Sequence, residues 1–173
     1  MPSPGLHLFL QYSQHAVQRC ALLWDLREPP ASARHASAPS PLSEFELSQH
    51  ATNPPVACLR VTCGIFPEDS WVAEAWNGLG VTVRDVLDAI HTTVYTQITY
   101  PEWYKLCPKQ QHRVNLVFDA RWRRSADPAR AREMGVLRAD CLLRHVSFAG
   151  MTAAPDNKSE DSTYLLTVGH PKR

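Results

Sequence analysis

The segment that most constrains the fold is a capped amphipathic helix that begins after Gly80. Thr82 can cap its first turn, and Asp85 stands where the reciprocal partner of a capping box is expected. Apolar residues then recur at helical spacing, at Val83, Val86, Leu87, Ile90, Val94 and Ile98. Arg84, Asp85 and Asp88 lie off this stripe. The pattern predicts a helix with one face packed against a core.

Two more helices are predicted after this one. Thr99 and Glu102 repeat the capping-box pattern and predict a short helix, which Pro108 ends. A third helix is predicted from Gln110 to Arg124. Its inward face carries Val114, Val117, Phe118 and Trp122. The middle of the chain is therefore helical.

Apolar runs on both sides of this helical region predict strands. Those before it are Leu6 to Tyr12, Cys20 to Leu26, Ala57 to Cys63 and Ser70 to Trp76. Those after it are Val136 to Met151, with a bend, and Thr163 to Val168. Strands, helices and strands follow one another without a regular βαβ alternation. This order predicts an α+β fold, with a mostly antiparallel or mixed sheet and about three helices packed on one side.

The length of 173 residues fits one domain over residues 1–173. A chain of this size hides roughly 70% of its unfolded surface on folding, which is enough for one sizeable core. Residues 28–43 are rich in Pro, Ala and Ser, and we expect a mobile surface loop there. Residues 152–162 are predicted to form a polar loop.

Cysteine use and hydropathy indicate the compartment. The five cysteines are an odd set without CxxC spacing, which is typical of reduced thiols and not of a disulfide framework. The start, MPSPGLHLFLQY, has no Lys or Arg before its apolar run, unlike a signal peptide. No apolar run is long enough to span a membrane. The sequence therefore predicts a cytoplasmic protein.

The net charge of +1 hides an asymmetry between the two halves of the chain. Residues 1–104 carry 5 Lys/Arg and 10 Asp/Glu, whereas residues 105–144 carry 10 and 4. The basic residues of interest are Arg113, Arg121, Arg123, Arg124, Arg130, Arg132 and Arg138. Solvated helix faces explain most of them, and a patch for a protein or RNA partner is the alternative. A pI of about 7.7 disfavours a dedicated nucleic-acid domain.

Catalytic signatures are absent from the sequence. It has no GxxxxGK[ST], GxGxxG or GxSxG motif. Cys141 and His145 are weak catalytic candidates, because on a strand they would face the same side four residues apart. The eight histidines have no HxxxH or HExxH pair, so no metal site is predicted. The sequence favours a protein that is not an enzyme, and an enzyme of undescribed type is kept as a second alternative.

Four segments resemble a known family. They are Trp24 to Pro30 (WDLREPP), Leu47 to Pro55 (LSQHATNPP), Val81 to Ile90 (VTVRDVLDAI), and Gly135 to Asp140 (GVLRAD) with Phe148-Ala149-Gly150. The chain resembles a fungal family of small proteins, common in mushrooms, that is catalogued only as a domain of unknown function. The resemblance implies a fungal source and no particular chemistry.

The aromatic content suggests a pocket between sheet and helices. Several tryptophans in a chain with a mobile loop could leave a cavity that needs only a few polar groups to orient a ligand. The residues expected to bind the ligand are Trp24, Arg27, Arg60, Trp76, Trp103, Phe118 and Trp122. Arg27 or Arg60 could pair with a carboxylate head group.

The leading hypothesis is a non-enzymatic binding protein for a small apolar or amphipathic molecule of the polyene pigment, lipid or terpenoid type. Mushrooms make many such polyenes and terpenoids, so this hypothesis rests partly on the resemblance. No cofactor is indicated beyond a non-covalently bound small molecule of this kind. The alternative is a protein or RNA interaction module that uses the basic segment 105–144. A homodimer through an exposed strand edge is also expected.

Overall fold

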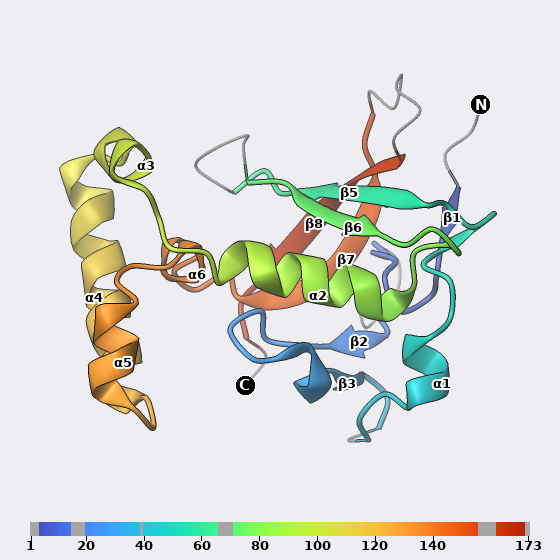
Figure 1. Cartoon of the computed structure of the whole chain (residues 1–173), viewed down its shortest axis with the longest axis horizontal. Helices are drawn as coiled ribbons and strands as arrows, with labels where there is room; N and C mark the ends of the chain where they lie inside the picture. The colour runs from blue at the N-terminus through green and yellow to red at the C-terminus, as the bar shows by residue number, and fades with distance from the viewer. Residues whose placement is uncertain (1–3, 15–19, 39, 66–70, 156–161, 172–173) are drawn as a thin grey trace.

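A four-stranded mixed sheet forms the centre of the computed structural model (Figure 1). The structure describes residues 4–14, 20–38, 40–65, 71–155 and 162–171. The strands are β5 (Cys58–Thr62), β6 (Ala73–Trp76), β7 (Ser147–Ala153) and β8 (Ser162–Gly169), in the order β6-β5-β8-β7. The inner pair, β5 and β8, is parallel, and the outer pairs are antiparallel. The predicted α+β fold with a mixed sheet is confirmed.

Side chains alternate between the two faces of this sheet, as a pleated strand requires. Leu59 and Val61 of β5 are buried, whereas Arg60 between them is only half-buried. Arg60 lies opposite Glu74 of β6 and Thr163 of β8. The predicted strands Ala57 to Cys63, Ser70 to Trp76 and Thr163 to Val168 are therefore confirmed in their described parts. Ser70 lies outside the described residues.

Helix α2 (Val83–Val94) covers one face of the sheet and packs mainly on β6. Thr82 accepts a hydrogen bond from the backbone N–H of Asp85, and the Asp85 carboxylate accepts one from that of Thr82. Its buried residues are Val83, Val86, Leu87, Ile90 and Val94. The cap and the apolar stripe are both as predicted, because each is encoded within a few residues.

A group of helices stands beside the sheet, at the left of Figure 1. These are α3 (Tyr100–Lys105), α4 (Pro108–Arg124) and α5 (Pro128–Glu133), and we call them the helical arm. The capping box of Thr99 and Glu102 forms as predicted. Helix α4 confirms the third predicted helix, and Val114 on its inward face is buried, whereas Val117, Phe118 and Trp122 are half-buried.

The predicted strand from Val136 to Met151 is wrong in its first half. Residues Arg138–Cys141 form a short helix, α6, and β7 begins only at Ser147. The cause is Asp140, whose carboxylate accepts a hydrogen bond from the backbone N–H of Leu137 at 2.8 Å and closes a turn. Gly150, at φ +105°, then makes the register shift between Phe148 and Met151 in β7.

The N-terminal strands are shorter than predicted. Only Gly5–Leu6 (β1) and Leu22–Leu23 (β2) are strands, because the chain turns after Leu6, where the N–H of Leu10 donates to the carbonyl of His7. Strand β1 pairs with β4 (Thr52–Asn53), and β2 pairs with β3 (Arg34–His35). A short helix α1 (Glu44–Leu47), capped by Ser43, follows.

The Pro-, Ala- and Ser-rich segment 28–43 carries structure of its own in its described part. It contains the 3₁₀ helix η1 (Pro30–Ser32) and strand β3, and Ala33 is buried. Its mobility stays a prediction. Of the predicted polar loop 152–162, strand β7 takes the first residues and β8 the last, and residues 156–161 lie outside the described part.

Candidate ligand pocket around Trp24

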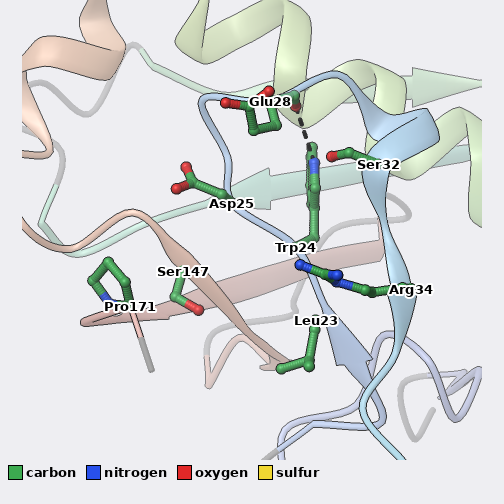
Figure 2. Close-up of a pocket in the computed structure, with 8 residues that line it drawn as sticks. All are labelled: Leu23, Trp24, Asp25, Glu28, Ser32, Arg34, Ser147 and Pro171. Carbon is green, nitrogen blue, oxygen red and sulfur yellow. Dashed lines mark hydrogen bonds between the residues drawn. The ribbon is translucent and has the colours of Figure 1, made fainter. Parts of the chain in front are cut away.

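A pocket of about 280 Å³ lies between the β2–β3 hairpin, the start of β7 and the end of the chain (Figure 2). We call it the Trp24 pocket. It is lined by Leu23, Trp24, Asp25, Glu28, Ser32, Arg34, Ser147 and Pro171. Six of the eight lie between Leu23 and Arg34, and the other two are Ser147 and Pro171. Segments distant in the sequence therefore meet at this pocket.

Trp24 is held rigidly at the wall of the pocket. Its indole Nε1–H donates to the carbonyl of Glu28 at 3.0 Å, shown as the dashed line in Figure 2. The ring centroid lies 6.0 Å from that of Phe148, and the carbonyl of Trp24 accepts from the N–H of Phe148 at 2.9 Å. Trp24 is only 3% exposed. The wall is thus formed before any ligand binds.

Asp25 and Arg27 neutralise each other beside the pocket. The carboxylate of Asp25 accepts from the Arg27 Nε at 2.9 Å, from its Nη2 at 2.6 Å and from its backbone N–H at 2.9 Å. The hydrogen bond to Asp25 raises the pKa of Arg27 further. The carbonyl of Arg27 also accepts from the hydroxyl of Tyr95 at 2.7 Å. Arg27 therefore fixes the turn and is not available to a carboxylate ligand.

Arg34 supplies the open positive charge of the pocket. Figure 2 shows its guanidinium pointing toward Trp24 from strand β3. Its side chain is exposed, and none of the described residues gives it a hydrogen bond or an ion pair. Glu28 lies at the opposite end of the pocket in the same view. The sequence analysis missed Arg34, because it lies in the segment predicted to be a loop and its position depends on the pairing of β3 with β2.

The residues predicted to bind a ligand lie in three separate places. Trp24 and Arg27 lie at the Trp24 pocket. Arg60 and Trp76 lie on the sheet, where the Nε of Arg60 is 3.1 Å from the Glu74 carboxylate and Trp76 is 73% exposed. Arg60 therefore has an ion-pair partner, although its Nε forms no hydrogen bond with that carboxylate, unlike the Nε of Arg27 with Asp25. The remaining three residues, Trp103, Phe118 and Trp122, belong to the helical arm.

In the helical arm, aromatic rings lie next to guanidinium groups. Arg121 lies 5.4 Å from the ring centroid of Phe118, and Arg123 and Arg132 lie 5.1 and 5.3 Å from that of Trp122. Trp103 lines a second pocket, of about 320 Å³, between α3 and α4. These rings are not part of the Trp24 pocket.

A buried ionic cluster joins the arm to the rest of the molecule, and the sequence analysis did not anticipate it. Glu102, which is 8% exposed, accepts from the indole N–H of Trp71 and from Arg138 at 3.2 Å. Arg121 donates twice to Asp140, at 2.8 and 3.0 Å, and Asp140 is 1% exposed. Buried charges in proteins are normally paired in this way. The only sequence signal was the spacing of Thr99 and Glu102.

The pKa of Glu102 reflects two opposed effects. Burial alone raises the pKa of this carboxyl, but the hydrogen bonds from Thr99 and Trp71 outweigh it. The pKa is therefore held below its usual 4.5, and Glu102 is ionised at neutral pH.

The Cys141–His145 candidate is not arranged as predicted. The two residues do not share a strand, because Cys141 ends α6 and His145 follows in a turn. Burial, with smaller effects from the Asp140 and Glu102 carboxylates, raises the pKa of the Cys141 thiol to about 12. A nucleophilic cysteine needs a lowered pKa, so this thiol is in the opposite state. His145 is exposed and lies against His170, with 4.5 Å between the ring centroids and 45° between the ring planes.

The described part of the chain also bears on metal binding and on membrane insertion. It contains no group of three or more His, Cys, Asp or Glu side chains placed to hold a metal ion. None of the five cysteines, all of which the structure describes, forms a disulfide. No helix in the same residues has the length and apolar character needed to cross a membrane.

Comparison with known proteins gives a family match. A model described as a family of unknown function (DUF6699) matches residues 22–161. Neither a curated protein nor a solved structure matches the chain significantly. The matched range includes the Trp24 to Pro30 segment, Arg34 and the whole helical arm.

Proposed function

Because the chain belongs to DUF6699, a family of unknown function that assigns no reaction or ligand, we propose its function from the Trp24 pocket: it is a non-enzymatic binding protein for a small amphipathic molecule. The apolar part of the ligand lies against Leu23, Trp24 and Pro171. Its anionic group pairs with Arg34. The observation that carries the proposal is the guanidinium of Arg34, which has no partner among the described residues and lies beside the fixed indole of Trp24.

The charges around the pocket narrow the ligand class. Arg27 and Arg60 are already paired with Asp25 and Glu74, so Arg34 takes the role first expected of them. A guanidinium recognises a carboxylate through two parallel hydrogen bonds. Among polyenes, lipids and terpenoids, those that carry a carboxylic acid fit this requirement. A hydrocarbon without an acid would leave the charge of Arg34 unmatched.

The source and compartment belong to the same proposal. The resemblance to a mushroom family points to a fungal protein, and cysteines that form no disulfide are in keeping with a cytoplasmic one. Such a protein would carry a hydrophobic acid of fungal metabolism through an aqueous compartment.

A homodimer is the expected state of this carrier. Strand β6 lies at one edge of the central sheet and carries the exposed Trp76. Unpaired strand edges readily pair with a second copy. Sedimentation velocity over a range of concentrations checks this expectation, and a monomer throughout would contradict it.

The experiment titrates the chain with a dansylated undecanoic acid and follows dansyl fluorescence. We expect saturable binding that Arg34→Gln weakens by about tenfold, since a charge-assisted hydrogen bond is lost. The methyl ester of the same probe should bind the wild-type chain as weakly as the acid binds the variant.

Arg113→Gln is the matched control. Arg113 is also exposed and unpaired among the described residues, but it lies on α4, away from the pocket. Its substitution should leave the affinity unchanged. Equal affinities of wild type and Arg34→Gln, or of acid and ester, would reject the proposal.

A further inference from the structure

The helical arm presents an apolar groove to solvent. The second pocket, of about 320 Å³, lies between α3 and α4, with Ile98, Trp103, Val136 and Asn115 in its lining. Tyr100 and Tyr104, one turn apart on α3, are 81% and 75% exposed. Large exposed aromatic side chains of this kind are enriched at protein interfaces. The groove can hold one or two apolar side chains.

Helix α4 also carries a basic surface on its solvent-exposed face. Lys109, Arg113 and Leu116 follow one another at helical spacing on its exposed face, and Leu116 is 56% exposed. Arg124 on α4 and Arg130 on α5 are exposed too. Among the described residues, none of these four cations has an ion-pair partner. The positive charge of the arm is therefore free to attract a partner.

We propose that the helical arm is a docking surface for a short acidic segment of another protein, with a leucine or an aromatic residue seated in the α3–α4 groove. Charge complementarity identifies the occupant: unpaired cations on the same arm as an apolar groove match a segment that carries both carboxylates and an apolar anchor. This site is separate from the Trp24 pocket, and the inference does not rest on the function proposed for that pocket.

The distribution of charge favours a short protein segment over a nucleic acid. Residues 1–104 carry 10 Asp/Glu and 5 Lys/Arg, so a long polyanion that leaves the arm meets a surface of like charge. A segment that covers the arm alone avoids this repulsion.

The test selects random peptides of about 12 residues on the intact chain and measures the enriched peptide by fluorescence anisotropy. We expect the enriched peptides to be acidic and to contain a leucine or an aromatic residue. Affinity should fall by about tenfold in the double variant Lys109→Glu with Arg113→Glu, because attraction becomes repulsion. Tyr100→Ala should weaken binding several-fold.

The control variant carries Arg84→Glu with Arg144→Glu. Arg144 is exposed and Arg84 pairs with the exposed carboxylate of Glu44; both lie outside the arm and the Trp24 pocket, and this variant changes the net charge by the same amount. It should bind the peptide like wild type. Enrichment without acidic residues, or equal binding by the Lys109 and Arg113 variant, overturns the proposal. An oligouridylate of similar length that binds the arm more tightly than the peptide also overturns it, in favour of a nucleic acid.

Discussion

A charged side chain can serve a ligand only when the protein itself leaves it unpaired. The arginines of this chain show the difference. Arg27 is held by Asp25 and Arg60 by Glu74, whereas Arg34 has no partner among the described residues. The sequence shows all three residues but not their pairing, because Arg60 and Glu74 meet only when β5 and β6 align. The presence or absence of a carboxylate partner therefore distinguishes Arg27 and Arg60 from Arg34, the candidate binding residue.

Cysteine reactivity is the first prediction at this scale. Cys107 is exposed, whereas burial raises the pKa of Cys141 to about 12 and leaves almost no thiolate at neutral pH. In the folded protein, iodoacetamide should modify Cys107 quickly and Cys141 only after unfolding. Peptide mapping by mass spectrometry measures both rates. Modification of Cys141 as fast as Cys107 would contradict its burial.

The buried ionic cluster gives a stability prediction. Glu102→Gln leaves Arg138 partly buried without its counter-charge, and should lower the free energy of unfolding by about 2 kcal/mol. Urea denaturation measures this change. Glu44→Gln is the control, because Glu44 pairs with Arg84 but its side chain is 89% exposed. It should leave the midpoint unchanged, since exposed pairs contribute little. Equal effects of the two variants would contradict the account.

The same carboxylate predicts a pH dependence. Folding lowers the pKa of Glu102 below its usual 4.5, so its ionised form stabilises the folded state above that pH. This stabilisation is lost as the pH falls through the lowered value. The stability difference between wild type and Glu102→Gln should thus be full at neutral pH and shrink in acid. Urea denaturation across the acidic range measures it, and a difference that grows in acid would show the wrong sign.

At the scale of elements, the glycine at position 150 allows the N-terminal segment to lie against β7, where the backbone N–H of Tyr12 donates to the carbonyl of Met151. A Cβ at Gly150, at φ +105°, would lie 2.6 Å from the carbonyl oxygen of Gln11. Gly150→Ala should therefore destabilise the fold by about 1–3 kcal/mol. Gly169, at the end of β8, has nothing within 4 Å of such a Cβ. Thermal unfolding of Gly150→Ala and Gly169→Ala tests this, and the account fails if both variants behave alike.

Elements with local signals were predictable, and those set by distant partners were not. Helices α2 and α3 follow from Thr82 with Asp85 and from Thr99 with Glu102, pairs that lie within one turn. Strands β1 and β2 each have two residues, and their ends depend on partners far along the chain. Helix α6 was read as a strand because Leu137 caps it, and leucine gives no capping signal.

The candidate site was predictable only in part for the same reason. Trp24 was identified from its motif. The wall of the pocket also depends on the contact between Trp24 and Phe148, and the open positive charge comes from Arg34. Phe148 and Arg34 lie on strands that are brought next to Trp24 only by the tertiary fold. The aromatic residues of the arm were assigned to the same ligand pocket as Trp24, because residue spacing in the sequence does not show that α3 and α4 stand beside the sheet (Figure 1).

At the scale of the whole molecule, the two proposed roles, ligand binding and docking of an acidic segment, fall on two separate surfaces. The Trp24 pocket lies on the sheet body, and the groove and free cations lie on the helical arm. Glu102 and Asp140 join the two parts through buried ion pairs. The arm can therefore take a partner while the pocket holds a ligand, and each can be inactivated without the other.

Native mass spectrometry of the chain purified gently from its own source tests the central claim most directly. The account predicts an excess mass that disappears on denaturation, corresponds to an amphipathic acid, and is missing from Arg34→Gln prepared in the same way. A clean apo mass for wild type, or the same excess mass in both proteins, would contradict a carrier role for the Trp24 pocket.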